Sequence, residues 1–219
     1  MQINRYMDKI FPNLELKPPL FYSWKIGIRF KLGVNYNPNH IYENCPYLLG
    51  VYERAITLFN ALHSTDDDMV IVIDVEAFAE DETVKRKLNV LSKFVKEKSV
   101  LYRLTQHTLP YLNHEEDDDG AYPIRRFLLN CKPSEIRFIP MIKAICNQDM
   151  GIKPSLYHRV YFINKSKNTI FHIYDDRGCD LLAASTETIR EIYNQYNEWI
   201  LDYDRNQIDK VFNGNDHFK

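Results

Sequence analysis

Apolar and polar residues along the first two thirds of the chain follow two patterns, one typical of strands and one of helices. Residues 21–32 are predicted to form a half-buried strand, because apolar and polar residues alternate from Trp24 to the end of this range. The continuous apolar run at residues 69–75 predicts a central strand. Further strands are expected at residues 100–104 and 123–131. Apolar residues at helical spacing predict helices at residues 46–63, 81–98 and 140–146, with Pro140 as the first residue of the last one.

The last third of the chain carries the clearest pattern. Residues 157–163 and 169–174 are apolar on both faces, and a short polar stretch joins them, which predicts an antiparallel hairpin. A turn symmetric about Ser166 and Lys167 would place His158 opposite Asp175. Residues 179–183 follow as a third strand, and an amphipathic helix is expected over 185–203.

These elements predict one α+β domain that spans residues 1–219. Its sheet should be mostly antiparallel, end in a C-terminal β-meander and carry flanking helices. The early alternation of strands and helices leaves room for one parallel pair, which would make the sheet mixed.

Composition narrows the class of protein. Of the 219 residues, 45% are hydrophobic, enough to fill a sizeable core and to exclude disorder. A net charge of −2 gives no bulk attraction for nucleic acid or for an anionic membrane, so neither is expected as a partner. The 4 cysteines lie far apart, without a C-x-x-C spacing, as expected for reduced thiols. No stretch resembles a signal peptide or a membrane helix, and a cytoplasmic location is therefore expected.

Motifs for common cofactors are absent from the sequence. The 7 glycines are scattered singly, so no phosphate-binding loop can be traced. No nucleotide, zinc-hydrolase or serine-hydrolase motif occurs either. We therefore expect no cofactor.

The segment Asp175-Asp176-Arg177-Gly178 permits two interpretations. As a turn, Asp175 would bond the backbone and Gly178 would supply a positive φ angle. As a site, His158 would pair with Asp175 at the strand end, and Asp176 and Arg177 would complete an acid–base or anion-binding cluster. We predict that Arg177 is held by a carboxylate or by backbone carbonyls of the helix after Pro140.

A metal site is a further alternative. Asp74 and Glu76 end an apolar strand, and Asp175 and Asp176 end a second one. Four carboxylates brought together in this way would bind Mg²⁺ or Mn²⁺ through oxygen ligands. The same positions are also where solvated carboxylates are expected, so the residues alone do not decide between the two.

The strongest sequence resemblance is to a bacterial family. The motifs that carry it are Tyr-Asp-Asp-Arg-Gly-Cys-Asp at residues 174–180, the hairpin before it, and the segments 25–33, 147–151 and 197–205. These resemble a family catalogued as a domain of unknown function, number 3885. The resemblance implies a single bacterial cytoplasmic domain and carries over no activity and no catalytic residue.

Two functions follow as hypotheses. The absence of catalytic motifs, together with an acidic stretch at residues 115–119, favours a non-enzymatic protein-binding module of the immunity or antitoxin type, which would cap a basic toxin. The alternative is a metal-dependent phosphodiesterase or nuclease that uses the carboxylates above and His158 as the base.

Overall fold

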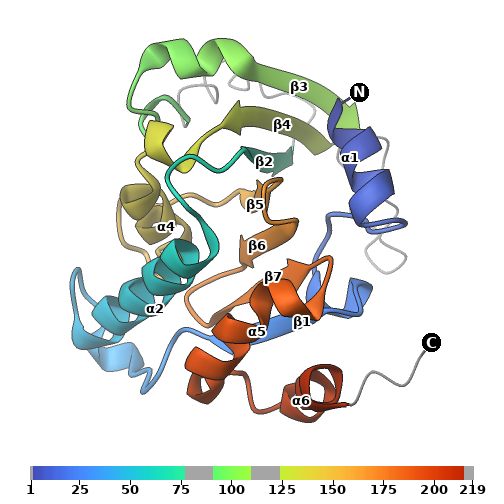
Figure 1. Ribbon diagram of the computed structural model, residues 1–219. Helices are drawn as coiled ribbons and strands as arrows, with labels where there is room; N and C mark the ends of the chain where they lie inside the picture. Colours follow the sequence, from blue (N-terminus) through green and yellow to red (C-terminus); the bar gives the residue numbers. More distant parts are fainter. Residues whose placement is uncertain (1, 77–90, 110–123, 215–219) are drawn as a thin grey trace, which may run out of the picture.

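The elements that alternate along the chain assemble around one twisted sheet (Figure 1). The structure is a computed structural model that describes residues 2–76, 91–109 and 124–214. Within these ranges the strand order is β1-β7-β6-β5-β2-β4-β3, and every neighbouring pair is antiparallel. The α+β class and the antiparallel sheet are therefore as predicted, and no parallel pair occurs among the described strands.

The bounds of the elements are as follows. The strands are β1 (Gly27–Lys31), β2 (Met69–Glu76), β3 (Leu104–Leu109), β4 (Ile124–Cys131), β5 (Arg159–Asn164), β6 (Thr169–Ile173) and β7 (Gly178–Ala183). The α-helices are α1 (Gln2–Ile10), α2 (Pro46–Leu62), α4 (Phe138–Cys146), α5 (Thr186–Gln195) and α6 (Arg205–Asn213). Short 3-10 helices lie at Phe21–Ser23, Pro38–His40, Lys98–Arg103, Pro133–Glu135 and Asn197–Trp199.

Both faces of the sheet are covered, which explains the continuous apolar run in β2. Ile71 and Ile73 point into the larger core, which α2, α4 and α5 cover. Val70 and Val72 point to the opposite face, where α1 and the segment after it form a second core. Figure 1 shows α2 and α4 on one side of the sheet and α1 on the other. A strand that is buried on both faces has no wet side, so its residues do not alternate.

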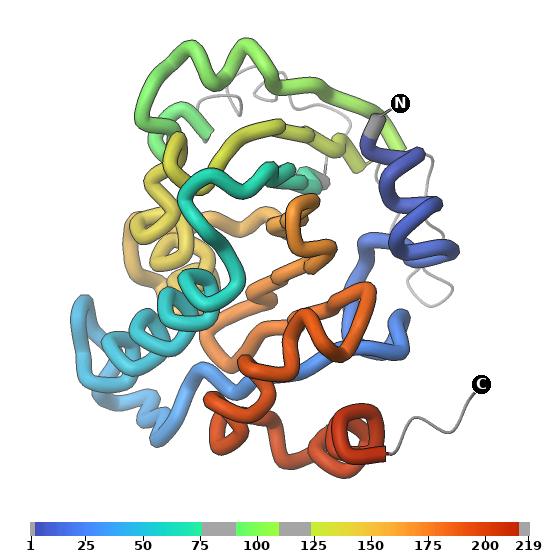
Figure 2. The backbone as a smooth tube through the Cα atoms, viewed as in Figure 1, coloured from blue at the N-terminus to red at the C-terminus, as the bar shows by residue number. Residues whose placement is uncertain are grey.

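The C-terminal meander forms as predicted. Asn164 pairs with Thr169, and the ladder continues with constant register to the pair of Tyr161 and His172. β7 then pairs with both β6 and β1, so the last third of the chain returns to the N-terminal strand. Figure 2 shows this path, with the orange to red C-terminal segment lying beside the blue segment that contains β1.

The helix expected over residues 185–203 is wrong in its length. α5 ends at Gln195, and the chain then turns so that Ile200 bridges to Phe30 and the Leu201 amide donates to the Arg29 carbonyl. Arg205 holds this turn by donating to the carbonyl of Asn197 at 2.9 Å. Pairing with the edge of β1 therefore overrides a helical pattern that is continuous in the sequence.

Other predicted boundaries also shift. The strand expected at residues 100–104 is a 3-10 helix, Lys98–Arg103, and β3 follows it. The prediction was wrong because a short apolar run does not distinguish a strand from a helical turn. Of the strand expected at 21–32, the first residues form a 3-10 helix and β1 begins at Gly27.

Two predicted helices are also corrected. α4 begins at Phe138, which makes Pro140 its third residue instead of its first. Most of the helix expected at 81–98 lies outside the described residues, but its expected end does not hold, because Val95 bridges to Ile136.

Candidate functional site

The segment from Asp175 to Gly178 forms a self-contained turn at the end of β6. The Asp175 carboxylate accepts the backbone N–H of Arg177 at 2.7 Å and its Nε–H at 2.8 Å. The Asp175 side chain is only 5% exposed, whereas that of Arg177 is 77% exposed. The guanidinium is thus held in place by a carboxylate of its own turn while it faces solvent.

Gly178 is required for a reason that differs from the prediction. Its φ angle is not positive, so the expected left-handed turn residue is wrong. A Cβ at this position would instead lie 2.0 Å from the Tyr174 hydroxyl and 2.6 Å from the Phe30 carbonyl oxygen. Close packing of β7 against β1 therefore demands glycine here.

Asp176 is the second buried carboxylate of this segment. It is 3% exposed and accepts a hydrogen bond from the hydroxyl of Tyr47, in the first turn of α2. Burial raises the pKa of Asp176, and the neighbouring Asp175 adds to the rise. The hydroxyl pKa of Tyr47 is raised for the same reasons, first by burial and then by its bond to Asp176. The pair ties the end of β6 to α2.

An exposed surface surrounds this turn. The backbone amides of Leu32 and Gly33 donate to the Arg177 carbonyl, at 2.8 and 3.4 Å. Val34 and Tyr36 follow and are 38% and 55% exposed. The Tyr36 ring packs edge-on against Tyr47 with centroids 5.2 Å apart. We call Val34, Tyr36 and Arg177 together the Arg177 surface.

The structure does not assemble the predicted acid–base cluster through strand pairing. β5 begins at Arg159, and its ladder with β6 ends at the pair of Tyr161 and His172. His158 precedes the strand, so the extrapolated pairing with Asp175 is not part of the ladder. The Asp175 carboxylate accepts a hydrogen bond from Arg177.

The structure also separates the carboxylates of the predicted metal site. β5 lies between β2, which carries Asp74 and ends at Glu76, and β6, which precedes Asp175 and Asp176. Both oxygens of Asp74 accept from Arg126, each at 2.7 Å. Within residues 2–76, 91–109 and 124–214, no group of three or more His, Cys, Asp or Glu residues is placed to hold a metal.

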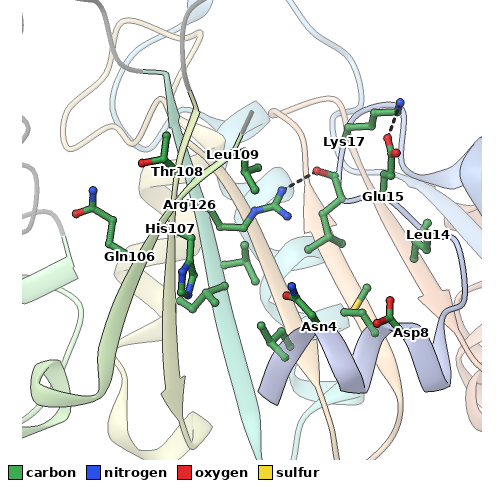
Figure 3. A pocket seen from close by; sticks show the side chains of 15 residues that line it. Asn4, Asp8, Leu14, Glu15, Lys17, Gln106, His107, Thr108, Leu109 and Arg126 are labelled. Atoms are coloured by element: carbon green, nitrogen blue, oxygen red, sulfur yellow. Dashed lines mark hydrogen bonds and ion pairs between the residues drawn. The ribbon is translucent and has the colours of Figure 1, made fainter. Parts of the chain in front are cut away.

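A pocket that the sequence did not indicate lies on the face of the sheet that α1 covers, opposite to the face that α2 and α4 cover. It has a volume of about 740 Å³ and is lined by residues of α1, the segment after it, and strands β2, β3 and β4. Figure 3 shows Asn4 and Asp8 on α1 facing the strand residues His107 and Arg126, with Glu15 and Lys17 at one side. A pocket of this size is typical of small-molecule sites.

Arg126 forms the polar part of the floor of this pocket. Its side chain is 18% exposed, and besides Asp74 it donates to the Leu16 carbonyl at 3.0 Å. His107 stands directly opposite Arg126 in the β3–β4 ladder. The only sequence signal was the adjacent pair Arg125-Arg126 in a strand, which must place one guanidinium on each face.

A buried row of polar residues crosses the same face of the sheet. Arg29 pairs with Asp180, Asp180 with His172, and His172 with Tyr161 on four adjacent strands. His172 is 2% exposed and its Nδ1–H donates to the Val160 carbonyl at 2.8 Å, so it is a core histidine. Burial lowers its pKa from 6.5 to about 4, which keeps the ring neutral.

The comparison of sequences identifies the family. The chain matches the family described as a domain of unknown function (DUF3885) over residues 3–204. The chain belongs to this family. An uncharacterised protein of Bacillus subtilis strain 168, YnaE, is 35% identical over 214 residues, which cover 93% of this chain and 99% of that protein. No solved structure matches.

The DUF3885 match takes in both regions described above. Residues 3–204 include the pocket beside α1 as well as the Arg177 surface. The family is thus the one that the sequence resembled. Among the helices of the described ranges, none is long and apolar enough to cross a membrane.

Proposed function

We propose that this DUF3885 protein is a non-enzymatic cytoplasmic binding module that recognises a partner protein through the Arg177 surface. The observation that carries the proposal is the state of Arg177, whose side chain is 77% exposed while its guanidinium is fixed by Asp175. Fixing an exposed side chain before binding lowers the entropy that is lost on binding.

The neighbouring residues support the same function. Val34 and Tyr36 are exposed apolar and aromatic residues in the segment whose backbone bonds the Arg177 carbonyl. Tyrosine and arginine are enriched at the centres of protein interfaces, where a few residues carry most of the binding energy. A partner that fits this surface offers an apolar side chain to Tyr36 and a carboxylate or carbonyl to Arg177.

Site-specific photocrosslinking tests the proposal in cells. A photoreactive phenylalanine analogue at position 36 should give a protein adduct of discrete mass, and one at Tyr203 should not. Tyr203 is a suitable control because it is a tyrosine that is 85% exposed. Arg177→Ala should reduce the adduct about fivefold or more, as truncation of a central interface arginine does.

Two outcomes would overturn the proposal. One is an identical set of adducts from positions 36 and 203, which would indicate random collision. The other is an unchanged adduct in Arg177→Ala while its melting temperature equals that of the wild type.

The immunity or antitoxin role is the specific form of this proposal. Its acidic stretch, Glu115–Asp119, lies outside the described residues, so it stays a prediction. Co-purification with the product of a neighbouring gene, lost when 115–119 is replaced by Ser and Gly, would support it. The metal-dependent phosphodiesterase or nuclease remains an alternative, and the pairing of Asp74 with Arg126 does not favour it.

A further inference from the structure

The pocket beside α1 presents hydrogen-bond donors on its floor. Arg126 uses its Nε and Nη2 for Asp74 and Leu16, and no bond from its Nη1 occurs among the described contacts. His107, opposite Arg126 on β3, also lines the pocket. Directly opposed residues of a ladder have Cβ atoms about 5 Å apart, so one ligand group can reach both side chains.

Most carboxylates around the pocket are engaged in ion pairs. Both oxygens of Asp74 bind Arg126, and Glu15 binds Lys17 at 2.7 Å. Asp8 remains as a carboxylate at the rim, where it is exposed to solvent. Water and salt screen an exposed charge far more than a half-buried one. Arg126 on the floor should therefore contribute more to the binding of a charged group than Asp8 at the rim.

The rest of the wall is mixed. Its polar residues are Asn4, Lys17, Gln106 and Thr108, and its apolar residues, which come from both sides of the pocket, are Ile3, Met7, Leu14, Leu16, Val72, Leu109 and Leu128. Arg126 is held between Asp74 and the segment after α1, because it donates to the Asp74 carboxylate and to the Leu16 carbonyl. The pocket therefore combines a fixed donor with a partly apolar lining around a volume of about 740 Å³.

We propose that this pocket binds a small carboxylic acid with an apolar body. The carboxylate accepts hydrogen bonds from Arg126 Nη1 and from His107, and the body packs between α1 and Leu128. The site is on the face of the sheet opposite to α2 and is independent of the Arg177 surface. The acid can be a free metabolite or the C-terminal carboxylate of a short peptide, because both present the same chemistry.

Calorimetric titration with 4-phenylbutyrate, its amide and acetate tests this proposal. The acid should bind about tenfold more tightly than the amide, since a charge-assisted bond is replaced by a neutral one. Acetate, which lacks an apolar body, should bind about tenfold more weakly than 4-phenylbutyrate as well. N-acetyl-Ala-Phe with a free carboxylate, compared with its C-terminal amide, shows whether a chain end is preferred.

Two histidine variants form a matched pair. His107→Ala should weaken 4-phenylbutyrate several-fold, whereas His40→Ala, in an exposed 3-10 helix, should not change it. Side-chain NMR signals of Arg126 in the wild type should shift on binding, and this readout needs no variant.

Three results would overturn the proposal: no binding of 4-phenylbutyrate at about 10 mM, equal binding of acid and amide, or shifts confined to residues outside the pocket. Arg177→Ala should leave the binding of 4-phenylbutyrate unchanged. If 4-phenylbutyrate does not bind, the proposed protein-binding function is unaffected. If the photocrosslinking experiment fails, the proposed pocket ligand is likewise unaffected.

Discussion

Tyr47 and Asp176 join two parts of the molecule that are 129 residues apart in the chain. The tyrosine stands in the first turn of α2, and the aspartate follows β6 at the end of the sheet. The bond gives a buried carboxylate the partner that it requires. It also places Tyr36 and Arg177 on one surface, because Tyr36 packs on Tyr47 and Arg177 follows Asp176.

Tyr47→Phe tests this relationship. Removal of the hydroxyl leaves the Asp176 carboxylate buried without that donor, which should lower the free energy of unfolding by about 1–3 kcal/mol. Urea denaturation measures the change. Tyr36→Phe is the control. Tyr36 is 55% exposed, so the free energy of unfolding of this variant should stay within about 0.5 kcal/mol of the wild type. Equal effects of the two variants would contradict the role given to Tyr47.

Gly178→Ala should destabilise the protein by about 1–3 kcal/mol, because the added methyl group collides with the Phe30 carbonyl as well as with a side chain. Gly50→Ala is the matched control. Gly50 lies inside α2 with nothing within 4 Å of its Cβ position, so alanine should stabilise by about 0.5–1 kcal/mol. Thermal melts of both variants give the comparison, and a neutral Gly178→Ala would refute the packing argument.

The ion pair of Arg126 and Asp74 predicts non-additive mutations. Arg126→Ala leaves Asp74, whose side chain is 3% exposed, without its partner, and should cost about 3 kcal/mol or more. The double variant with Asp74→Ala should cost less than Arg126→Ala alone, because no buried charge remains. A double-mutant cycle by urea denaturation measures this coupling, and additive costs would show that the pair contributes nothing.

Asp180 predicts a dependence of stability on pH. Burial raises its pKa from 3.8 to about 6, with Asp204 adding to the rise and Arg29 opposing it. Between these two values the folded protein holds a proton that the unfolded chain has lost. This contribution to stability is therefore complete below about pH 4 and is lost as the pH rises through about 6.

Asp180→Asn should remove this dependence. Relative to the wild type, the variant should gain up to about 3 kcal/mol between pH 4 and pH 7. The free energy of unfolding of the variant should also differ from the wild type by an amount that does not depend on pH. The asparagine side chain has one acceptor oxygen, whereas the Asp180 carboxylate contacts both the backbone N–H of Phe21 and Arg29. Urea midpoints of both proteins across this range give the difference, and parallel curves would contradict the raised pKa.

His63 and His172 change the stability with pH in the direction opposite to that of Asp180. Burial lowers both pKa values from 6.5 to about 4, so the stability from these residues is present above pH 6.5 and is lost as the pH falls through about 4. Each of the two histidine shifts is at least as large as that of Asp180, while Asp176, whose pKa is also raised, acts in the same direction as Asp180. The wild-type protein should therefore become less stable overall on acidification from pH 7 to pH 4, and a rise over this range would contradict the assignment.

Local patterns in the sequence determined much of the secondary structure and the pairing of strands that are neighbours in the chain. The hairpin of β5 and β6 has a short polar turn between two apolar runs, which fixes its register up to Tyr161 and His172. Helix α2 follows from the spacing of its apolar residues, and the family follows from the motif at 174–180. Each of these features depends on residues close together in the chain.

Only the tertiary structure decided which distant residues meet. β2 inserts between β5 and β4, which gives Asp74 the partner Arg126 and keeps it from Asp175 and Asp176. The pocket beside α1 and the end of α5 at Gln195 likewise depend on strands paired across much of the chain. Periodicity shows which face of a strand is buried but not which strand lies beside it, since many strand orders bury the same apolar faces.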